Sequence, residues 1–144
     1  MQISVIDLQD VPIDTECVRR AAGLAAQTRA HDFESVSIVL VDDARITELN
    51  REHRGFDSPT DVLSYGSDEE DPEYMGDVLI SVDTATRQAA SAGRAPLHEI
   101  AWLAAHGVLH LLGHDDVADD QRAEMVRIQD GILRKLLDEE SVQT

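Results

Sequence analysis

Apolar positions recur along the chain with two different spacings, which separate the predicted strands from the predicted helices. Short runs rich in β-branched residues indicate strands, and apolar positions three and four apart indicate amphipathic helices. Strand patterns lie within 1–10 and at 35–41, 60–65 and 76–82. Helical patterns start near 14, 42, 84, 96 and 118 and run to about 30, 50, 92, 112 and 137, respectively.

Turn and cap residues support several of these boundaries. Asp14 or Thr15 can cap the first helix, Gly93 stops the third helix, and Gly113 stops the fourth. The acidic run at 68–73, which contains a proline, indicates a solvated loop. Strands and helices interleave early and helices dominate late. The sequence therefore predicts an α+β fold, with helices packed on a small mixed sheet of about four strands.

Length and composition favour one domain over 1–144. A chain of 144 residues matches the usual size of one domain, and neither a repeat nor a Pro-rich linker divides it. The acidic first residues do not resemble a signal peptide, and the longest apolar stretch, 100–112, is too short to span a bilayer. Cys17 is the only cysteine, which excludes an internal disulfide and a thiolate zinc cluster. We therefore expect a cytoplasmic protein with no membrane partner and no disulfide-linked partner.

The charge of the chain disfavours one class of function. It has 12 basic and 29 acidic residues and a formal net charge of −17. Binding to nucleic acid depends largely on phosphate neutralisation, so this charge opposes non-specific attraction to RNA. An RNA enzyme of this composition needs partner proteins or a small basic patch, for which the candidates are Arg45, Arg51, Arg54, Arg87 and Arg94.

Two histidines on the fourth predicted helix form a candidate metal-binding pair. His106 and His110 are four residues apart, so they share one helix face with Cβ atoms about 5–6 Å apart. Imidazole nitrogens bind zinc at about 2.0–2.1 Å, and this spacing lets both rings reach one ion. Glycine follows His106 at the place where peptidase helices of the His-Glu-x-x-His type have their general base, which disfavours a peptidase.

A third ligand is expected just after this helix ends. A left-handed turn at Gly113 lets the chain come back beside the metal, which makes Asp116 the natural third ligand of a zincin-like site. On a continuing helix, His114 would lie about 12 Å beyond His106. A shifted turn nevertheless keeps His114 open as the alternative ligand. Asp115 can either orient a ligating histidine or cap the last helix.

Three blocks of the chain resemble the YbeY family of bacterial rRNA maturation endoribonucleases. The block from Leu49 to Tyr65 is similar to the family's LN-x-x-Y-R-x-x-D-x-P-T-D-V-L-S-F. The run GDVLIS at 76–81 is close to G-D-I-x-I-S, and the metal helix with its turn, from His106 to Asp116, is similar to H-G-x-L-H-L-x-G-Y-D-H. The blocks follow one another in family order and at family spacing.

The resemblance implies a zinc-dependent, single-strand-specific endoribonuclease with an α+β fold. It implies action in ribosomal RNA maturation, notably at the small-subunit RNA 3′ end, and in ribosome quality control. The implied partners are ribosomal RNA and the ribosome or its small subunit, with the associated proteins. Carried over by position, one zinc ion would be held by His106, His110 and Asp116, and Arg54 matches an arginine associated with activity.

The chain departs from the family pattern at three positions. Asp116 replaces a histidine ligand, and His53 and His114 replace aromatic residues. An aspartate binds zinc at about 2.0–2.2 Å, and its negative charge makes the metal a weaker Lewis acid.

The expected mechanism uses Arg54 and Asp115 as catalytic residues. Zinc with an open position provides hydroxide near neutrality, and Arg54 pairs with the phosphate through its planar fork. The general base stays open among zinc hydroxide, Asp115 and Glu99, and the RNA 2′-hydroxyl can itself be the nucleophile. Arg54 can instead form a salt bridge with Asp57 or Asp61. Rival functions are a ribosome assembly factor with a structural zinc and a zinc peptidase.

Overall fold

One mixed sheet is formed by four strands in the computed structural model, which describes residues 1–68 and 70–143, the last five of them by backbone alone. The strands are β1 (Gln2–Asp7), β2 (Ser35–Val41), β3 (Val62–Gly66) and β4 (Tyr74–Ser81). β2 lies between β1 and β4 and is parallel to both, whereas β3 pairs antiparallel with β4 and forms one edge. The predicted α+β fold with a four-stranded mixed sheet is confirmed.

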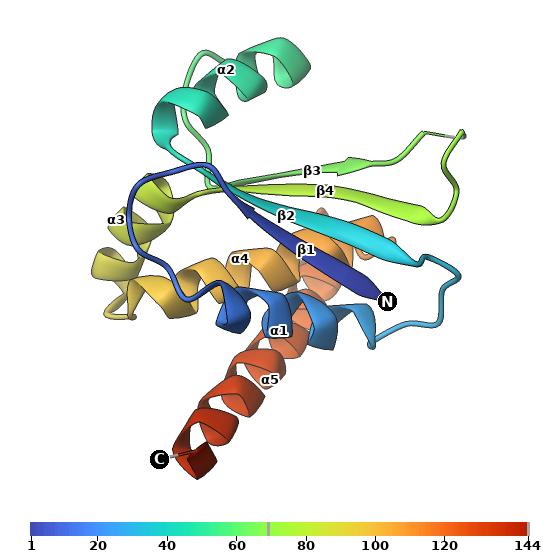
Figure 1. Cartoon of the computed structure of the whole chain (residues 1–144), viewed down its shortest axis with the longest axis vertical. Helices are drawn as coiled ribbons and strands as arrows, with labels where there is room; N and C mark the ends of the chain where they lie inside the picture. The colour runs from blue at the N-terminus through green and yellow to red at the C-terminus, as the bar shows by residue number, and fades with distance from the viewer. Residues whose placement is uncertain (69, 144) are drawn as a thin grey trace.

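The helices cover the two faces of this sheet unequally. In the described part of the chain they are α1 (Thr15–Ala26), α2 (Asp43–Arg54), α3 (Val82–Ala92), α4 (Pro96–Leu111) and α5 (Asp119–Gln143). Figure 1 shows α1 and α4 against one face with α5 beyond them, while α2 lies on the opposite face. None of these helices is both long enough and apolar enough to cross a membrane.

The main core lies between the sheet and α4. Most of the apolar side chains of this helix are buried, which agrees with its largely apolar sequence. They pack with the inward-facing residues of β2 and β4, and the shared core includes Ile38, Leu40, Val78, Ile80, Ile100, Leu103, Val108 and Leu109. Full burial of each large aliphatic side chain contributes about 1.5–3 kcal/mol. This packing fixes α4 rigidly on the sheet.

A smaller core holds α2 on the other face of the sheet. Val41, Ile46 and Leu63 are buried together there, so α2 is anchored to both β2 and the edge strand β3. Asp43 strengthens the start of α2, because its carboxylate accepts hydrogen bonds from Ser81 and Thr84, both at 2.6 Å. The first turn of α2 is thereby tied to the junction of β4 and α3.

Gly107 allows α4 to come unusually close to the sheet. A Cβ atom at this position would lie 2.3 Å from Cγ1 of Val78 and 3.1 Å from Oγ of Ser64. Only a residue without a side chain fits such an approach. In His-Glu-x-x-His peptidases this position carries the general base. Here the close packing of α4 against β3 and β4 requires a glycine instead.

Helix ends are where the structure differs most from the sequence prediction. α1 ends at Ala26, four residues before the predicted end, and Thr28 Oγ1 donates to the carbonyl of Ala25. α2 continues to Arg54 and ends at Gly55, which has a left-handed φ of 76°. Its last turn is polar, so apolar periodicity gives no signal for it. Part of the predicted acidic loop, residue 69, lies outside the described residues.

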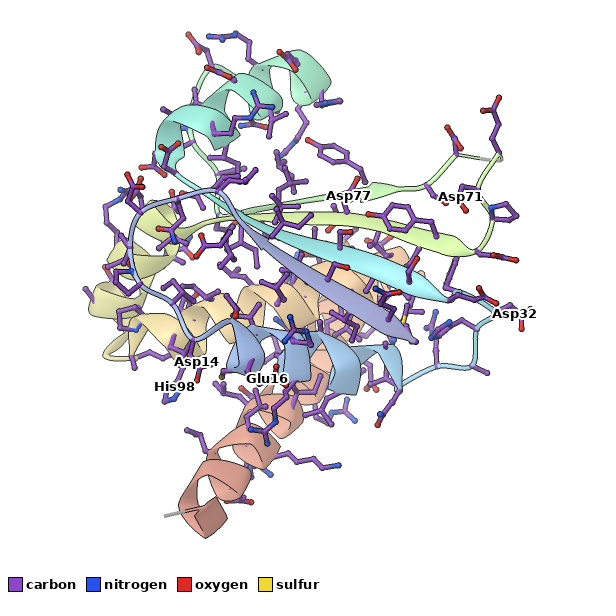
Figure 2. All side chains as sticks on the ribbon, viewed as in Figure 1. Asp14, Glu16, Asp32, Asp71, Asp77 and His98 are labelled. Atoms are coloured by element: carbon purple, nitrogen blue, oxygen red, sulfur yellow. The ribbon has the colours of Figure 1, made fainter. Side chains whose placement is uncertain are left out.

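The negative charge is spread over the molecule. Figure 2 shows Asp14 and Glu16 at the start of α1, Asp32 in the connection before β2, and Asp71 and Asp77 along the β3–β4 hairpin. These acids lie on different parts of the surface and form no single acidic face in this view.

Candidate metal centre

The last turns of α4 bring two imidazole rings together. Nε2 of His106 lies 3.0 Å from Nε2 of His110, and the rings meet edge to face at 77°. Both side chains are partly buried, with exposed fractions of 22% and 30%, so the pair is still open to the solvent on one side. The spacing along the helix therefore produces the convergence that a shared ion requires.

A tight turn after α4 brings a carboxylate to the same point. Gly113 adopts a φ of 97°, a left-handed conformation that favours glycine, and the chain reverses there. Asp116 Oδ2 then lies 3.6 Å from Nε2 of His106 and 3.5 Å from Nε2 of His110. Among the described residues, these three are the group of His, Cys, Asp or Glu side chains close enough to hold one metal ion.

The spacing of the three donor atoms fits a small divalent cation. Ligands at about 2.0–2.2 Å from a tetrahedral zinc ion lie about 3.3–3.6 Å from one another. The three separations here, 3.0, 3.5 and 3.6 Å, are close to that range. Two nitrogens and one carboxylate oxygen are also donors that zinc accepts. Three protein donors leave a fourth position of a tetrahedron for an outside ligand.

Two arginines hold the turn that carries the carboxylate. Arg29 Nη1 donates to the carbonyl of Leu112 at 3.1 Å, at the C-terminal end of α4. Arg122 Nε donates to the carbonyl of Asp116 at 3.2 Å, and its Nη2 donates to the carbonyl of Val117 at 3.3 Å. These bonds satisfy carbonyl groups outside the helices and fix the backbone of the third donor residue.

Gln129 on α5 orients the ring of His106. Its Nε2 donates to the carbonyl of Trp102 at 3.1 Å, which directs its Oε1 towards Nδ1 of His106 at 3.4 Å. An acceptor at Nδ1 favours the tautomer with a free lone pair on Nε2, the form that binds metal. Burial lowers the pKa of His106, and the neighbouring His110 lowers it further, against smaller opposing effects of Gln129 and Asp116. A lowered pKa favours the neutral form of the ring, which is the form that binds a metal.

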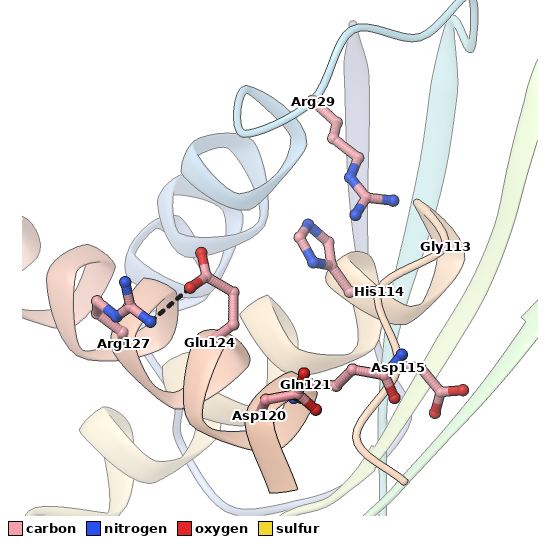
Figure 3. A pocket seen from close by; sticks show the side chains of 8 residues that line it. All are labelled: Arg29, Gly113, His114, Asp115, Asp120, Gln121, Glu124 and Arg127. Atoms are coloured by element: carbon pink, nitrogen blue, oxygen red, sulfur yellow. Dashed lines mark hydrogen bonds and ion pairs between the residues drawn. The ribbon is translucent and has the colours of Figure 1, made fainter. Parts of the chain in front are cut away.

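His114 and Asp115 do not join the three donors. Figure 3 shows the His114 ring beside the guanidinium of Arg29, in a hollow of about 520 Å³ that none of the donors lines. Burial and then the charge of Arg29 lower the pKa of His114. Asp115 Oδ1 accepts hydrogen bonds from the amides of Asp116, at 2.7 Å, and Val117, at 3.2 Å. Asp115 thus stabilises the turn through its carboxylate.

A cleft opens beside the two histidines. It has a volume of about 370 Å³ and runs along β3, between the last turn of α2 and the end of α4. Its lining comprises His53, Arg54, Val62, Leu63, Ser64, Tyr65, His106 and His110. Sequence patterns alone gave no reason to place His53, Ser64 and Tyr65 in the site, since they come from elements that meet only in the folded chain.

Arg54 differs from the other arginines of the predicted basic patch. Four of the five form ion pairs: Arg45 with Glu48, Arg51 with Asp57, Arg87 with Asp43, and Arg94 with Glu99. Arg54 lies over the ring of Phe56 at 5.3 Å and has no ion pair within the described residues. Its guanidinium lines the cleft and keeps its charge available to a ligand.

The alternative partners considered for Arg54 are engaged elsewhere. Asp57 pairs with Arg51 at 3.0 Å, and Asp61 Oδ1 accepts from the amide of Val62 at 2.8 Å. Glu99, one of the candidate bases, pairs with Arg94 at 3.2 Å, and burial raises its pKa. It does not line the cleft.

Comparisons with known proteins agree on one family. A family model described as endoribonuclease YbeY matches residues 8–137. A protein of that name from Moorella thermoacetica is 41% identical, over 92% of this chain and 96% of its own length. Another from Pelotomaculum thermopropionicum is also 41% identical, over 94% of this chain and 97% of its own length. The solution structure of TM1509 from Thermotoga maritima has the same fold, with a TM-score of 0.69, 24% identity and coverage of 99% and 93%.

Proposed function

The chain belongs to the YbeY family of endoribonucleases, and on this premise we propose that it cleaves single-stranded ribosomal RNA with one zinc ion held by His106, His110 and Asp116. One observation carries the proposal: His106 and His110 line the same cleft as the unpaired Arg54, and Asp116 lies 3.6 and 3.5 Å from their Nε2 atoms. A metal ion and a cation for the phosphate both stabilise charge that develops during phosphodiester cleavage, and the residues beside the cleft can supply both.

The residues of the cleft have separable tasks in this proposal. A zinc ion, when bound, supplies Lewis-acid polarisation of a phosphoryl oxygen. Arg54 binds the scissile phosphate through two parallel N–H groups and stabilises the charge that develops on its oxygens. The stack on Phe56 restricts the guanidinium of Arg54 and thereby directs it. Asp116 adds a negative charge that a third histidine would lack, so the ion is a weaker Lewis acid.

The catalytic role predicted for Asp115 stays a prediction. One of its oxygens is already an acceptor for two backbone amides, which favours a structural role in the turn. We assign no general base to a side chain of the described residues, and the substrate 2′-hydroxyl remains a candidate nucleophile.

We propose that the substrate is ribosomal RNA near the small-subunit 3′ end and that the chain works in the cytoplasm with the ribosome and its proteins, as one domain over 1–144. The family resemblance supports this assignment. The net charge of −17 adds a reason for protein partners, because basic ribosomal proteins attract an acidic chain that RNA repels.

A non-catalytic assembly factor with a structural zinc is the rival function. A structural site has four protein ligands, whereas three are brought together in the described residues. A peptidase is disfavoured for a second reason, since Gly107 has no room for the glutamate that such enzymes need next to the first histidine.

The decisive experiment compares two arginines of the same helix turn. Arg54→Ala should keep its zinc content and lose cleavage of single-stranded RNA by the metal-loaded protein, about 100-fold or more in kcat. Arg51→Ala, which removes an exposed ion pair with Asp57, should cleave like the wild type. Cleavage by Arg54→Ala at the wild-type rate would show that Arg54 has no role in the reaction. A metal-loaded wild type that cuts no RNA would favour the assembly factor.

A further inference from the structure

A pair of stacked rings forms one wall of the cleft. The centroids of His53 and Tyr65 are 4.6 Å apart, and the rings are tilted by 41°. His53 is exposed at the last turn of α2, while Tyr65 is partly buried on β3. The chain has only two Phe, two Tyr and one Trp, so few aromatic side chains are available for a ring pair beside the candidate metal ligands. Tyr65 supports one face of the imidazole, and the exposed side is left for another planar group.

The free edge of β3 forms the adjoining wall. β3 pairs only with β4 among the described strands, and Ser81 N donates to the carbonyl of Asp61. Because hydrogen-bonded residues alternate along an antiparallel pair, Leu63 and Tyr65 also direct their backbone groups to β4. The N–H and C=O of Ser64 therefore point away from the sheet. Ser64 lines the cleft, which gives the cleft one backbone donor and one acceptor side by side.

We propose that these two walls form a subsite for one unpaired nucleobase next to the scissile phosphate. The base stacks on His53, which Tyr65 supports, and its Watson–Crick edge is hydrogen-bonded by the backbone of Ser64. This inference rests on the proposed function, because it assigns a task in RNA cleavage. Arg54 and His53 line the same cleft, so a base on the ring places its own phosphate near the guanidinium.

The chemistry of this subsite fits any unpaired base. Stacking accepts every base because each has a π-face. The Watson–Crick edges of adenine, cytosine, guanine and uracil each present a donor beside an acceptor, which one extended residue can complement. A paired base has that edge occupied, and a cleft of about 370 Å³ suits one nucleotide and excludes a duplex. The subsite thus accounts for single-strand specificity with little sequence preference.

The test combines variants of His53 with substrates that lack one base. A short single-stranded RNA with a single cut is compared with versions that carry an abasic ribonucleotide at each position around the cut. For the wild type, one abasic position should raise KM about 5- to 100-fold, the range of one lost stacking contact. His53→Ala should raise KM for the intact RNA similarly and be insensitive to that abasic position, because the two changes remove the same contact.

Two controls separate stacking from other effects of the substitution. His53→Phe keeps a flat ring and should retain KM within about threefold of the wild type. His31→Ala removes a histidine that lies against Phe33, outside the cleft, and should leave KM unchanged. Zinc content should be the same in all three variants.

Each outcome decides the proposal. An unchanged KM in His53→Ala, or no abasic position that affects the wild type, overturns the subsite while cleavage itself continues. If the edge of β3 binds an extended peptide instead of a base, neither His53→Ala nor an abasic position should change KM for the RNA. The affinity for the RNA is measured in parallel. If the metal-loaded wild type cuts nothing, the proposed function fails. The affinities of wild type and His53→Ala for the intact and abasic RNAs then support or overturn the subsite.

Discussion

Nδ1 of His106 lies 3.4 Å from Oε1 of Gln129, a side chain that is only 1% exposed. The glutamine comes from α5, 23 residues further along the chain, and its amide is fixed by the carbonyl of Trp102. The ring orientation of one candidate metal ligand thus depends on how the last helix packs on α4.

This contact predicts a loss of metal affinity when the acceptor is removed. Gln129→Met keeps the length of the side chain but cannot accept a hydrogen bond from Nδ1, so zinc affinity should fall about 10–100-fold. A competition titration with a chromogenic chelator measures the change. Gln121→Met on the first turn of the same helix is the matched control, and equal affinities in both variants would refute the role of Gln129.

The third donor can be identified by metal content. Asp116→Ala should lose most of its zinc, whereas His114→Ala should keep it, because His114 lies beside Arg29 and apart from the donors. Asp116→His should retain the metal, since imidazole is an equally good zinc ligand. Elemental analysis of the purified variants gives the result. Loss of zinc in His114→Ala and not in Asp116→Ala would move the third ligand to the histidine.

Replacing Gly107 should destabilise the fold through one contact. Gly107→Ala puts a methyl group 2.3 Å from Cγ1 of Val78, and such overpacking costs about 1–3 kcal/mol of unfolding free energy. Val78→Ala in the same chain should recover part of this loss, because the two positions are in contact. Urea denaturation measures both.

A second glycine provides the control for that experiment. Gly131 lies in α5, and a methyl group added there would meet no atom within 4 Å, so Gly131→Ala should stabilise the helix by about 0.5–1 kcal/mol. Destabilisation of similar size at both positions would mean that crowding at Val78 is not the cause.

Asp43 predicts a pH dependence of stability. Burial alone would raise its pKa, but hydrogen bonds from Ser81, Thr84 and Arg87 and the charge of Arg87 together hold it below the ordinary 3.8. A lowered pKa in the folded state stabilises the protein above the ordinary value, and this contribution is lost as the pH falls through the lowered one.

The matched variant for this prediction is Asp43→Asn, which does not titrate. Wild type should exceed the variant in unfolding free energy near neutral pH, and the difference should shrink as the pH falls below about 4. Denaturation curves over this pH range provide the measurement. A difference that stays constant with pH would show that the charge of Asp43 is unimportant.

Local sequence patterns were sufficient to predict the strands, the helices and the three candidate metal ligands. Two histidines four apart and a glycine that ends the helix are separated by few residues, so the geometry follows from helix periodicity and one left-handed turn. The cleft could not be predicted in the same way. His53 and Tyr65 belong to a polar helix end and an edge strand, and their contact depends on the small core around Ile46 and Leu63.

Contacts between residues far apart in the sequence could not be predicted either. No spacing rule connects Gln129 with His106, or Arg29 with the carbonyl of Leu112, 83 residues away. Arg54 was expected either to bind phosphate or to pair with a nearby acid. The fold shows that Asp57 pairs with Arg51 instead, and phosphate binding by Arg54 stays a prediction.

The neutralised arginines on the surface imply an unusual response to ionic strength. With four of the candidate cations compensated by carboxylates and a net charge of −17, the protein repels a polyanion at long range. Added salt shortens the Debye length to about 8 Å at physiological concentration and weakens this repulsion first. Encounter with RNA should therefore become faster as salt is raised, until the short-range contact of Arg54, the uncompensated member of that candidate set, is weakened as well. Most nucleic-acid-binding proteins show the opposite trend from the lowest salt upwards.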